Sequence, residues 1–208
     1  MRFLPLACLL AFALALPAAA QAPPPRIKGR IVDFDGLTFH LAPENGKPLA
    51  IRLQAKTQIM TMSKRSLAAV TPGSYAGATV TAADGALRAE EVHLYPDPMR
   101  GSSEGRIALS INRFVITGTV SATAAGNFTL SYRGARMAAG TCDGRAAPGA
   151  GQPPCTAEAV ITVPPEAAVT ALTPADRRLL VPGAIATVTV ETDTKGNRST
   201  PGLILEKP

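Results

Sequence analysis

The chain has 208 residues, of which 46% are hydrophobic, and a formal net charge of +6 at pH 7. This length allows one large or two small domains. No segment beyond the first twenty residues approaches the ~20 consecutive apolar residues that a membrane-spanning helix needs, so we expect a soluble protein after export.

The first twenty residues are typical of an export signal. Arg2 supplies the positive charge, residues 3–16 are apolar, and residues 18–20 form a small-x-small cleavage site. We expect cleavage before Gln21 and a mature protein that is periplasmic or secreted.

Loss of Arg2 lowers the net charge from +6 to +5. That charge is typical of an ordinary solvated surface, or of a preference for envelope polyanions or anionic lipid headgroups. Nucleic acid is not expected as a partner, because no basic cluster is interleaved with aromatic residues.

The following region predicts a small β-barrel. After a proline-rich lead, alternating apolar residues and turn signals predict a series of extended segments. Ser63 is a candidate N-cap for one or two helical turns that end at Pro72-Gly73. Three strands, a short helix and two strands form the order of an OB-fold. The lead covers residues 21–25, and the five strands are 27–32, 37–41, 49–53, 74–81 and 87–94, with a further extended piece at 57–62 before the helix.

The second half of the chain repeats this plan. Ile51 and Ile161 begin two stretches that align without a gap at an offset of 110 residues, as far as Val80 and Val190. A duplication of this length indicates two copies of one domain rather than a solenoid. We therefore predict a mainly β protein with two tandem five-stranded OB-like barrels, each with one short helix. The expected boundaries are module 1 at 26–95, a linker at 96–113, and module 2 at 114–206 with a cysteine-containing loop insertion at 135–159.

Two cysteines remain after the expected signal is removed. Cys8 leaves with the signal, while Cys142 and Cys155 stay in the mature chain. An even count in an oxidising compartment predicts one disulfide. A redox or metal pair is the alternative, but the spacing is not C-x-x-C and no histidine is near.

The pattern from Gly29 to Val92 resembles a bacterial domain-of-unknown-function family of secreted proteins. It reads G-x-[IV], T-x-I, L-x-x-[IV]-x-P-G and then D-G-x-L-x-A-x-x-V along the chain. The segment 96–105, Pro-Asp-Pro-Met-Arg-Gly-Ser-Ser-Glu-Gly, resembles a proteobacterial subgroup of that family. The resemblance implies an OB-like barrel and an envelope location, and it implies no catalytic residue. The second copy departs from the pattern at Ala167, where the first copy has Thr57.

Met60 and Met62 are the candidate metal ligands. Two residues apart on a strand, they point to one face, and thioethers are ligands for Cu(I). His40, His93 or Met99 could complete such a site if the fold brings them close. Core packing is the alternative and the expected outcome, with Met62 buried and distant from these groups, because it aligns with a core-type leucine of the second copy.

The sequence offers no credible catalytic group. Residues 101–105 match the letters of a G-x-S-x-G elbow, but they lie in a turn-rich linker without the strand and helix that the motif needs. Glu90 and Glu91 would face opposite sides of a strand, which disfavours joint acid–base work. We therefore expect a non-enzymatic binding or scaffold protein of the bacterial envelope, with no cofactor. Its partner would be an envelope protein or a polyanionic ligand. The alternative is a periplasmic Cu(I) accessory protein using Met60 and Met62.

Overall fold

The computed structural model describes residues 24–138, 140–144 and 153–206. The expected export signal, most of the proline-rich lead and part of the expected insertion lie outside the described residues. The described part is mainly β, with thirteen strands, three short 3-10 turns and no α-helix. In chain order these are β1 (Arg26–Phe34), β2 (Thr38–Pro43), β3 (Leu49–Lys64), η1 (Leu67–Ala69), β4 (Tyr75–Ala83), β5 (Ala86–Tyr95), η2 (Asp97–Met99), β6 (Gly105–Ser110), β7 (Arg113–Ala124), β8 (Asn127–Arg136), β9 (Cys142–Asp143), β10 (Pro154–Thr162), β11 (Ala168–Pro174), η3 (Arg177–Leu179), β12 (Ile185–Thr192) and β13 (Arg198–Glu206).

Five strands close a mixed barrel. Their order is β3-β13-β12-β1-β2, and β2 pairs again with β3 to complete the ring. All neighbours are antiparallel except β13 and β3, which run parallel. The inward positions of these strands form one apolar core, in which Ile31, Phe39 and Ile51 have no exposed surface. The predicted five-stranded barrel is therefore present.

The other eight strands lie outside this barrel and surround a second apolar core. β10, β8, β7, β4 and β5 are neighbours in that order, and β10 also runs parallel to β5 over two residue pairs. β6 pairs antiparallel with β7, and β9 pairs antiparallel with β8. Ile116, Phe128 and Ile161 lie at the centre of this core with no exposed surface.

Each group of strands draws on both copies of the sequence. The closed barrel takes β1, β2 and β3 from the first copy but β12 and β13 from the second. The second group takes β7, β8 and β10 from the second copy and β4 and β5 from the first. The expectation of tandem barrels, each built from one continuous module, is wrong in this respect. The cause is β3, which was expected as two separate segments but runs unbroken for 16 residues and carries the chain out of the barrel.

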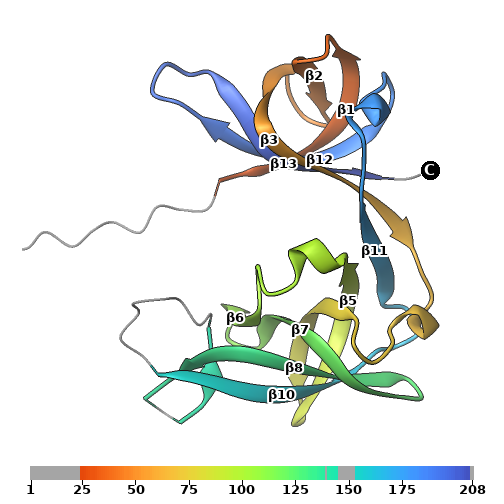
Figure 1. The fold of residues 1–208 in the computed structure, drawn as a ribbon, viewed down its shortest axis with the longest axis vertical. Coiled ribbons are helices and arrows are strands. Elements are labelled where there is room, and N and C mark those ends of the chain that lie inside the picture. Colours follow the sequence, from red (N-terminus) through yellow and green to blue (C-terminus); the bar gives the residue numbers. More distant parts are fainter. Residues whose placement is uncertain (1–23, 139, 145–152, 207–208) are drawn as a thin grey trace, which may run out of the picture.

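Two strands cross between the groups as an antiparallel pair (Figure 1). The C-terminal part of β3 pairs with β11, and Met62 lies opposite Leu172. These two residues occupy the same position in the two sequence copies, 110 residues apart. The crossing therefore has a local two-fold symmetry. In the second copy the equivalent of β3 is split into β10 and β11 by Pro164 and Pro165, which have no N–H to donate to a sheet.

A glycine is required in the first strand of each copy. A Cβ at Gly29 would lie 2.5 Å from the carbonyl oxygen of Ala42, and a Cβ at Gly118 would lie as close to the carbonyl oxygen of Ser131. Because glycine has no Cβ, β1 can approach β2 closely at Gly29, and β7 can approach β8 closely at Gly118.

The short helices expected in each copy are only 3-10 turns. η1 and η3 span three residues each, and Ser63 belongs to β3 rather than to a helix cap. In η3, Asp176 accepts a hydrogen bond from the Arg178 amide, whereas Ser66 makes no side-chain cap in η1. Within the described residues, no helix has the length and apolar character to span a bilayer.

The Cys142–Cys155 disulfide is confirmed and joins β9 to β10. The two Cα atoms are 5.9 Å apart, and Cys155 is buried. Only part of the expected insertion is a loop among the described residues, because β9 and the start of β10 both lie within it. A disulfide is typical of an oxidising compartment outside the cytoplasm.

Strand exchange predicts that neither half of the chain folds alone. We expect residues 21–104 and 105–208, produced separately, to lack a cooperative thermal transition, because each would leave open sheet edges and half-built cores. Mixing the two fragments should restore the transition and the β-type circular dichroism spectrum of the intact chain. A cooperative transition in either isolated fragment would refute the exchanged arrangement.

Candidate functional site

Two adjoining cavities lie beside the crossing of β3 and β11. The first, here called the crossover cavity, has a volume of about 190 Å³, and its neighbour has about 270 Å³. The walls combine β1, η2, β11 and β13, so they come from both sequence copies. The residues that line both cavities are Arg26, Met99, Leu172 and Ile204.

Three of the four methionines beyond the expected signal line these two cavities. Met62 and Met99 line the crossover cavity together with His93, and Met60 lines the neighbouring cavity with Met99. Met60 is buried, but Met62 is only half-buried. The expectation that Met62 lies buried and apart from His93 and Met99 is therefore wrong. His40 does not join them: its Nδ1 is 2.6 Å from Asp33 Oδ1, between β2 and β1.

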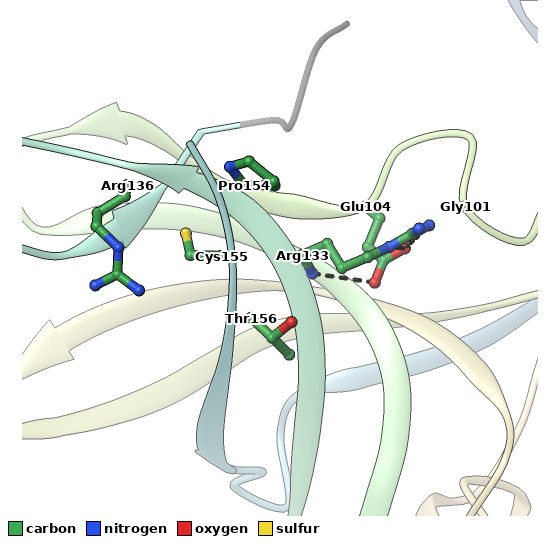
Figure 2. Close-up of a pocket in the computed structure, with 7 residues that line it drawn as sticks. All are labelled: Gly101, Glu104, Arg133, Arg136, Pro154, Cys155 and Thr156. Carbon is green, nitrogen blue, oxygen red and sulfur yellow. Dashed lines mark hydrogen bonds and ion pairs between the residues drawn. The ribbon is translucent and has the colours of Figure 1, made fainter. Parts of the chain in front are cut away.

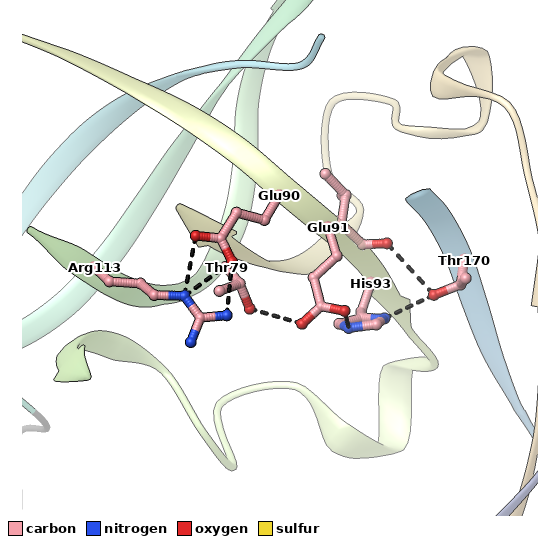
Figure 3. Close-up of polar contacts among 7 residues, drawn as sticks. Thr79, Glu90, Glu91, His93, Arg113 and Thr170 are labelled. Carbon is pink, nitrogen blue, oxygen red and sulfur yellow. Dashed lines mark hydrogen bonds and ion pairs between the residues drawn. The ribbon is translucent and has the colours of Figure 1, made fainter. Parts of the chain in front are cut away.

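His93 is held in a chain of polar contacts (Figure 3). Its Nδ1 lies 2.7 Å from the Thr170 hydroxyl oxygen, which lies 3.4 Å from the carbonyl oxygen of Val92. Its Nε2 lies 3.4 Å from Glu91 Oε2, and the other oxygen of Glu91 accepts a hydrogen bond of 2.9 Å from Thr79. The imidazole thus contacts Thr170 of β11 on one side and Glu91 of β5 on the other, and Thr79 of β4 holds Glu91 in place.

This chain of contacts is compatible with two tautomers of His93. Where the Thr170 hydroxyl donates to Nδ1 at 2.7 Å, Nε2 carries the hydrogen and donates towards Glu91. Where the hydroxyl donates to the Val92 carbonyl at 3.4 Å, Nδ1 donates to Thr170 and the lone pair on Nε2 faces the carboxylate of Glu91. In the second case, two acceptors face one another and need a cation between or beside them, either a proton on Nε2 or a metal ion. Metal-ligating histidines have this arrangement, in which the second ring nitrogen donates to a fixed acceptor.

Glu90 and Glu91 do not lie on opposite faces as the sequence predicted. Both carboxylates accept hydrogen bonds from threonines two residues apart on β4, Thr81 for Glu90 and Thr79 for Glu91. A register shift in the β4–β5 pairing at this point allows it, because a bulge adds one residue to a strand. Arg113 binds Glu90 at 2.6–3.0 Å and lowers the pKa of that carboxyl, so Glu90 is an ionised partner of Arg113.

Tyr75 presents a free hydroxyl in the wall of the crossover cavity. Tyr75 is 2% exposed, and its hydroxyl hydrogen has no acceptor among the described residues. Burial raises the pKa of Tyr75, while the backbone amides of Ser103 and Gly101, which approach its hydroxyl oxygen, lower that pKa by less, so the hydroxyl remains protonated at neutral pH. The ring packs against Tyr95 at 5.8 Å between centroids and against the Arg100 guanidinium at 5.6 Å. A buried donor without a partner costs about 1–3 kcal/mol, which a ligand in the cavity would offset.

The cavity therefore offers two thioethers, one imidazole and neutral hydroxyl groups. Thioethers and imidazole favour Cu(I) among the metals of biology, since both partners are soft or borderline. Among the described residues, no group of three or more His, Cys, Asp or Glu side chains gathers in one place. The donor set is therefore one for a soft ion rather than for Mg²⁺ or Ca²⁺.

A larger cavity beside the disulfide has a different character (Figure 2). It has a volume of about 530 Å³ and is lined by Glu104, Arg133, Arg136 and Cys155 among others. Glu104 binds the Arg133 guanidinium at 2.8 and 3.0 Å and also accepts from its backbone amide. This pair fastens the segment before β6 to β8, so we interpret it as structural.

Comparisons with known proteins add no relative. No family model, no curated protein and no solved structure matches the chain. The resemblance to a secreted bacterial family thus stays a prediction from the sequence.

Sequence reasoning missed two residues of the cavity region. They are Tyr75, which lines the crossover cavity, and Thr170, which contacts His93. One signal was present: Tyr75 stands where the second copy has Ile185, and His93 where it has Ile204. A polar residue that replaces an apolar one at a repeated position indicates a role specific to that copy.

Removal of the Tyr75 hydroxyl should make the ligand-free protein more stable, because that hydroxyl has no hydrogen-bond acceptor. We expect Tyr75→Phe to raise the free energy of unfolding of the ligand-free protein by about 1 kcal/mol, because it removes an unsatisfied buried donor. Tyr132→Phe is the control, since the Tyr132 hydroxyl donates to the Cys142 carbonyl at 3.3 Å, and it should lower stability by about 1 kcal/mol. Urea unfolding followed by circular dichroism measures both. Equal destabilisation by the two variants would contradict a free hydroxyl.

Proposed function

We propose that this chain is a non-enzymatic metal-binding accessory protein of the bacterial envelope that holds Cu(I) in the crossover cavity. The observation that carries the proposal is the convergence of Met62, Met99 and His93 on one cavity. These residues come from β3, η2 and β5, so only the folded chain brings them together.

The electrostatics of the cavity suit a monovalent ion. Neutral thioethers and a neutral imidazole add no charge, so Cu(I) would bring a single positive charge. The Glu91 carboxylate beside His93 compensates that charge, whereas Arg26 on the cavity wall opposes it. A divalent ion would double both the repulsion from Arg26 and the attraction to Glu91, so charge alone does not select against it. The ligands do, because hard ions prefer carboxylate and carbonyl oxygens to the thioethers of this cavity.

A catalytic role for the His93 contacts is disfavoured. Thr170, His93 and Glu91 have the order of a hydroxyl, a base and an acid, but Thr170 is 8% exposed and its hydroxyl is bonded to a backbone carbonyl. A nucleophile needs access to substrate and a base that accepts its proton. The G-x-S-x-G letters at 101–105 are followed by strand β6 rather than by a helix, so that motif also lacks its context.

The disulfide supports a site of action in the periplasm. Cys142 and Cys155 form a bridge, which persists in oxidising compartments. Because both cysteines are in the disulfide, neither offers a free thiolate to a metal ion. Methionine thioethers and histidine imidazoles are then the ligands for Cu(I) among the described residues.

Binding of a polyanionic ligand is the second candidate function. Arg26 and the free donor of Tyr75 line the same cavity, and both suit anionic oxygen atoms rather than a cation. The mature chain's net charge of +5 would attract such a ligand at long range.

Copper titration tests the first candidate. We expect the oxidised protein to take one Cu(I) from a chromophoric chelator under ascorbate and argon. Met62→Leu and Met99→Leu should each weaken binding by at least about tenfold, or about 1.4 kcal/mol. Met60→Leu should have a smaller effect, because Met60 lines the neighbouring cavity.

Met137→Leu is the matched control, since Met137 is 39% exposed and lines neither cavity. It should leave Cu(I) affinity unchanged. The metal proposal would be refuted if the wild-type protein did not compete for Cu(I). It would also be refuted if all four methionine variants lost the same amount of Cu(I) affinity.

Tripolyphosphate titration tests the second candidate. If the cavity binds anions, calorimetry should show saturable binding that weakens with salt, and Arg26→Gln should lower the affinity by about tenfold. Arg198→Gln, an exposed change outside both cavities, should not. Arg26→Gln should leave Cu(I) binding intact or strengthen it, so the same variant separates the two candidates.

A further inference from the structure

An apolar groove lies on the closed barrel, away from the crossover cavity. It has a volume of about 640 Å³ and is lined chiefly by Leu179, Val181, Ile185 and Leu205, with Thr61 and Glu206 at its edge. Leu179 is 47% exposed and Val181 is 51% exposed. Large apolar side chains gathered in one concave surface mark an interaction site more often than scattered ones do.

The equivalent surface in the other group of strands is covered by the chain itself. Gly73 and Gly183 are equivalent turn residues with φ of +87° and +90°, and each donates its amide to a strand carbonyl at 2.8 Å. At Gly73, the segment 96–103 lies over the turn: Arg100 donates to the Gly73 carbonyl at 3.0 Å and stacks on Tyr75. Tyr75 is 2% exposed under this segment, whereas its counterpart Ile185 is only half-buried.

The charged side chains around the groove indicate the charge of a segment that could bind there. The carbonyl of Gly183 is already bonded at 2.9 Å by Arg30, which thus replaces Arg100 on this side. Arg177 and Arg178 stand beside Leu179 on η3, with Asp176 3.9 Å from Arg178 Nε, and Lys28 pairs with Glu206 at 2.6 Å. These five groups together carry one net positive charge. An occupant therefore needs no arginine, and the basic rim favours an acidic one.

We propose that this groove docks a turn-forming, acidic segment of a partner protein, seated as residues 96–103 are seated on the equivalent surface. An apolar side chain of that segment fills the space between Leu179, Val181 and Ile185. Its carboxylates pair with Arg177 and Arg178 at the rim. The site is distinct from the crossover cavity, because the two share no lining residue.

A labelled peptide tests this surface. The probe is residues 96–105 of this chain with Arg100→Glu, a segment that keeps the turn and adds the favoured charge. Fluorescence anisotropy with the full mature chain should show saturable binding below about 1 mM, and the unchanged peptide should bind at least about tenfold more weakly. Leu179→Ser with Val181→Ser should abolish binding.

Ile111→Ser is the matched control, since Ile111 is 92% exposed and lies outside the groove. It should leave peptide binding unchanged. The proposal is overturned if the acidic peptide does not saturate, or if the groove variants bind it as the wild type does. It is also overturned if the groove holds a second copy of the chain, seen as a dimer that Leu179→Ser disrupts, or if it binds neutral phosphatidylcholine vesicles instead.

Discussion

The antiparallel pairing of β3 with β11 is the constraint on which the rest of the structure depends. At this crossing Met62 lies opposite Leu172, its counterpart in the second sequence copy. Because equivalent residues meet there, each copy must send its remaining strands to the opposite side. β12 and β13 therefore complete the closed barrel, and β4 and β5 join the other group. An extended β3 makes this arrangement possible, since a strand that does not turn cannot return to its own barrel.

The two proposed sites lie where the structure departs from that symmetry. The frame is repeated, but His93 stands where the other copy has Ile204, and Tyr75 stands where it has Ile185. These replacements put a polar, thioether-rich cavity on one side of the crossing and an apolar groove on the other. The linker adds to the difference, because η2 covers one turn and supplies Met99 to the cavity. Two surfaces at equivalent places in the fold thus differ, one a polar cavity and the other an apolar groove.

The sequence predicted local features well and the pairing of distant strands poorly. Alternation placed most strands, and cysteine count and compartment placed the disulfide, because both depend on nearby residues. Exchange between the copies escaped prediction, since apolar alternation defines a strand's buried face but not the copy that supplies its neighbour. The bulge at Glu90 escaped for a similar reason: it shifts the register by one residue without any glycine or proline to signal it. The methionines were identified by chemistry, and their convergence with His93 depended on the exchange.

A site built at the crossing also ties ligand binding to the fold as a whole. Met62, His93 and Met99 belong to three segments that meet only if β3 and β11 are paired. A ligand held by all three would bind the native chain and not the unfolded one, and would stabilise the exchanged arrangement by mass action. The same logic explains why a single copy would not suffice: its β3 would lack the partner that turns Met62 towards the linker and β5. The pairing of β3 with β11 therefore creates, between the two groups of strands, a cavity lined by residues of both halves of the chain.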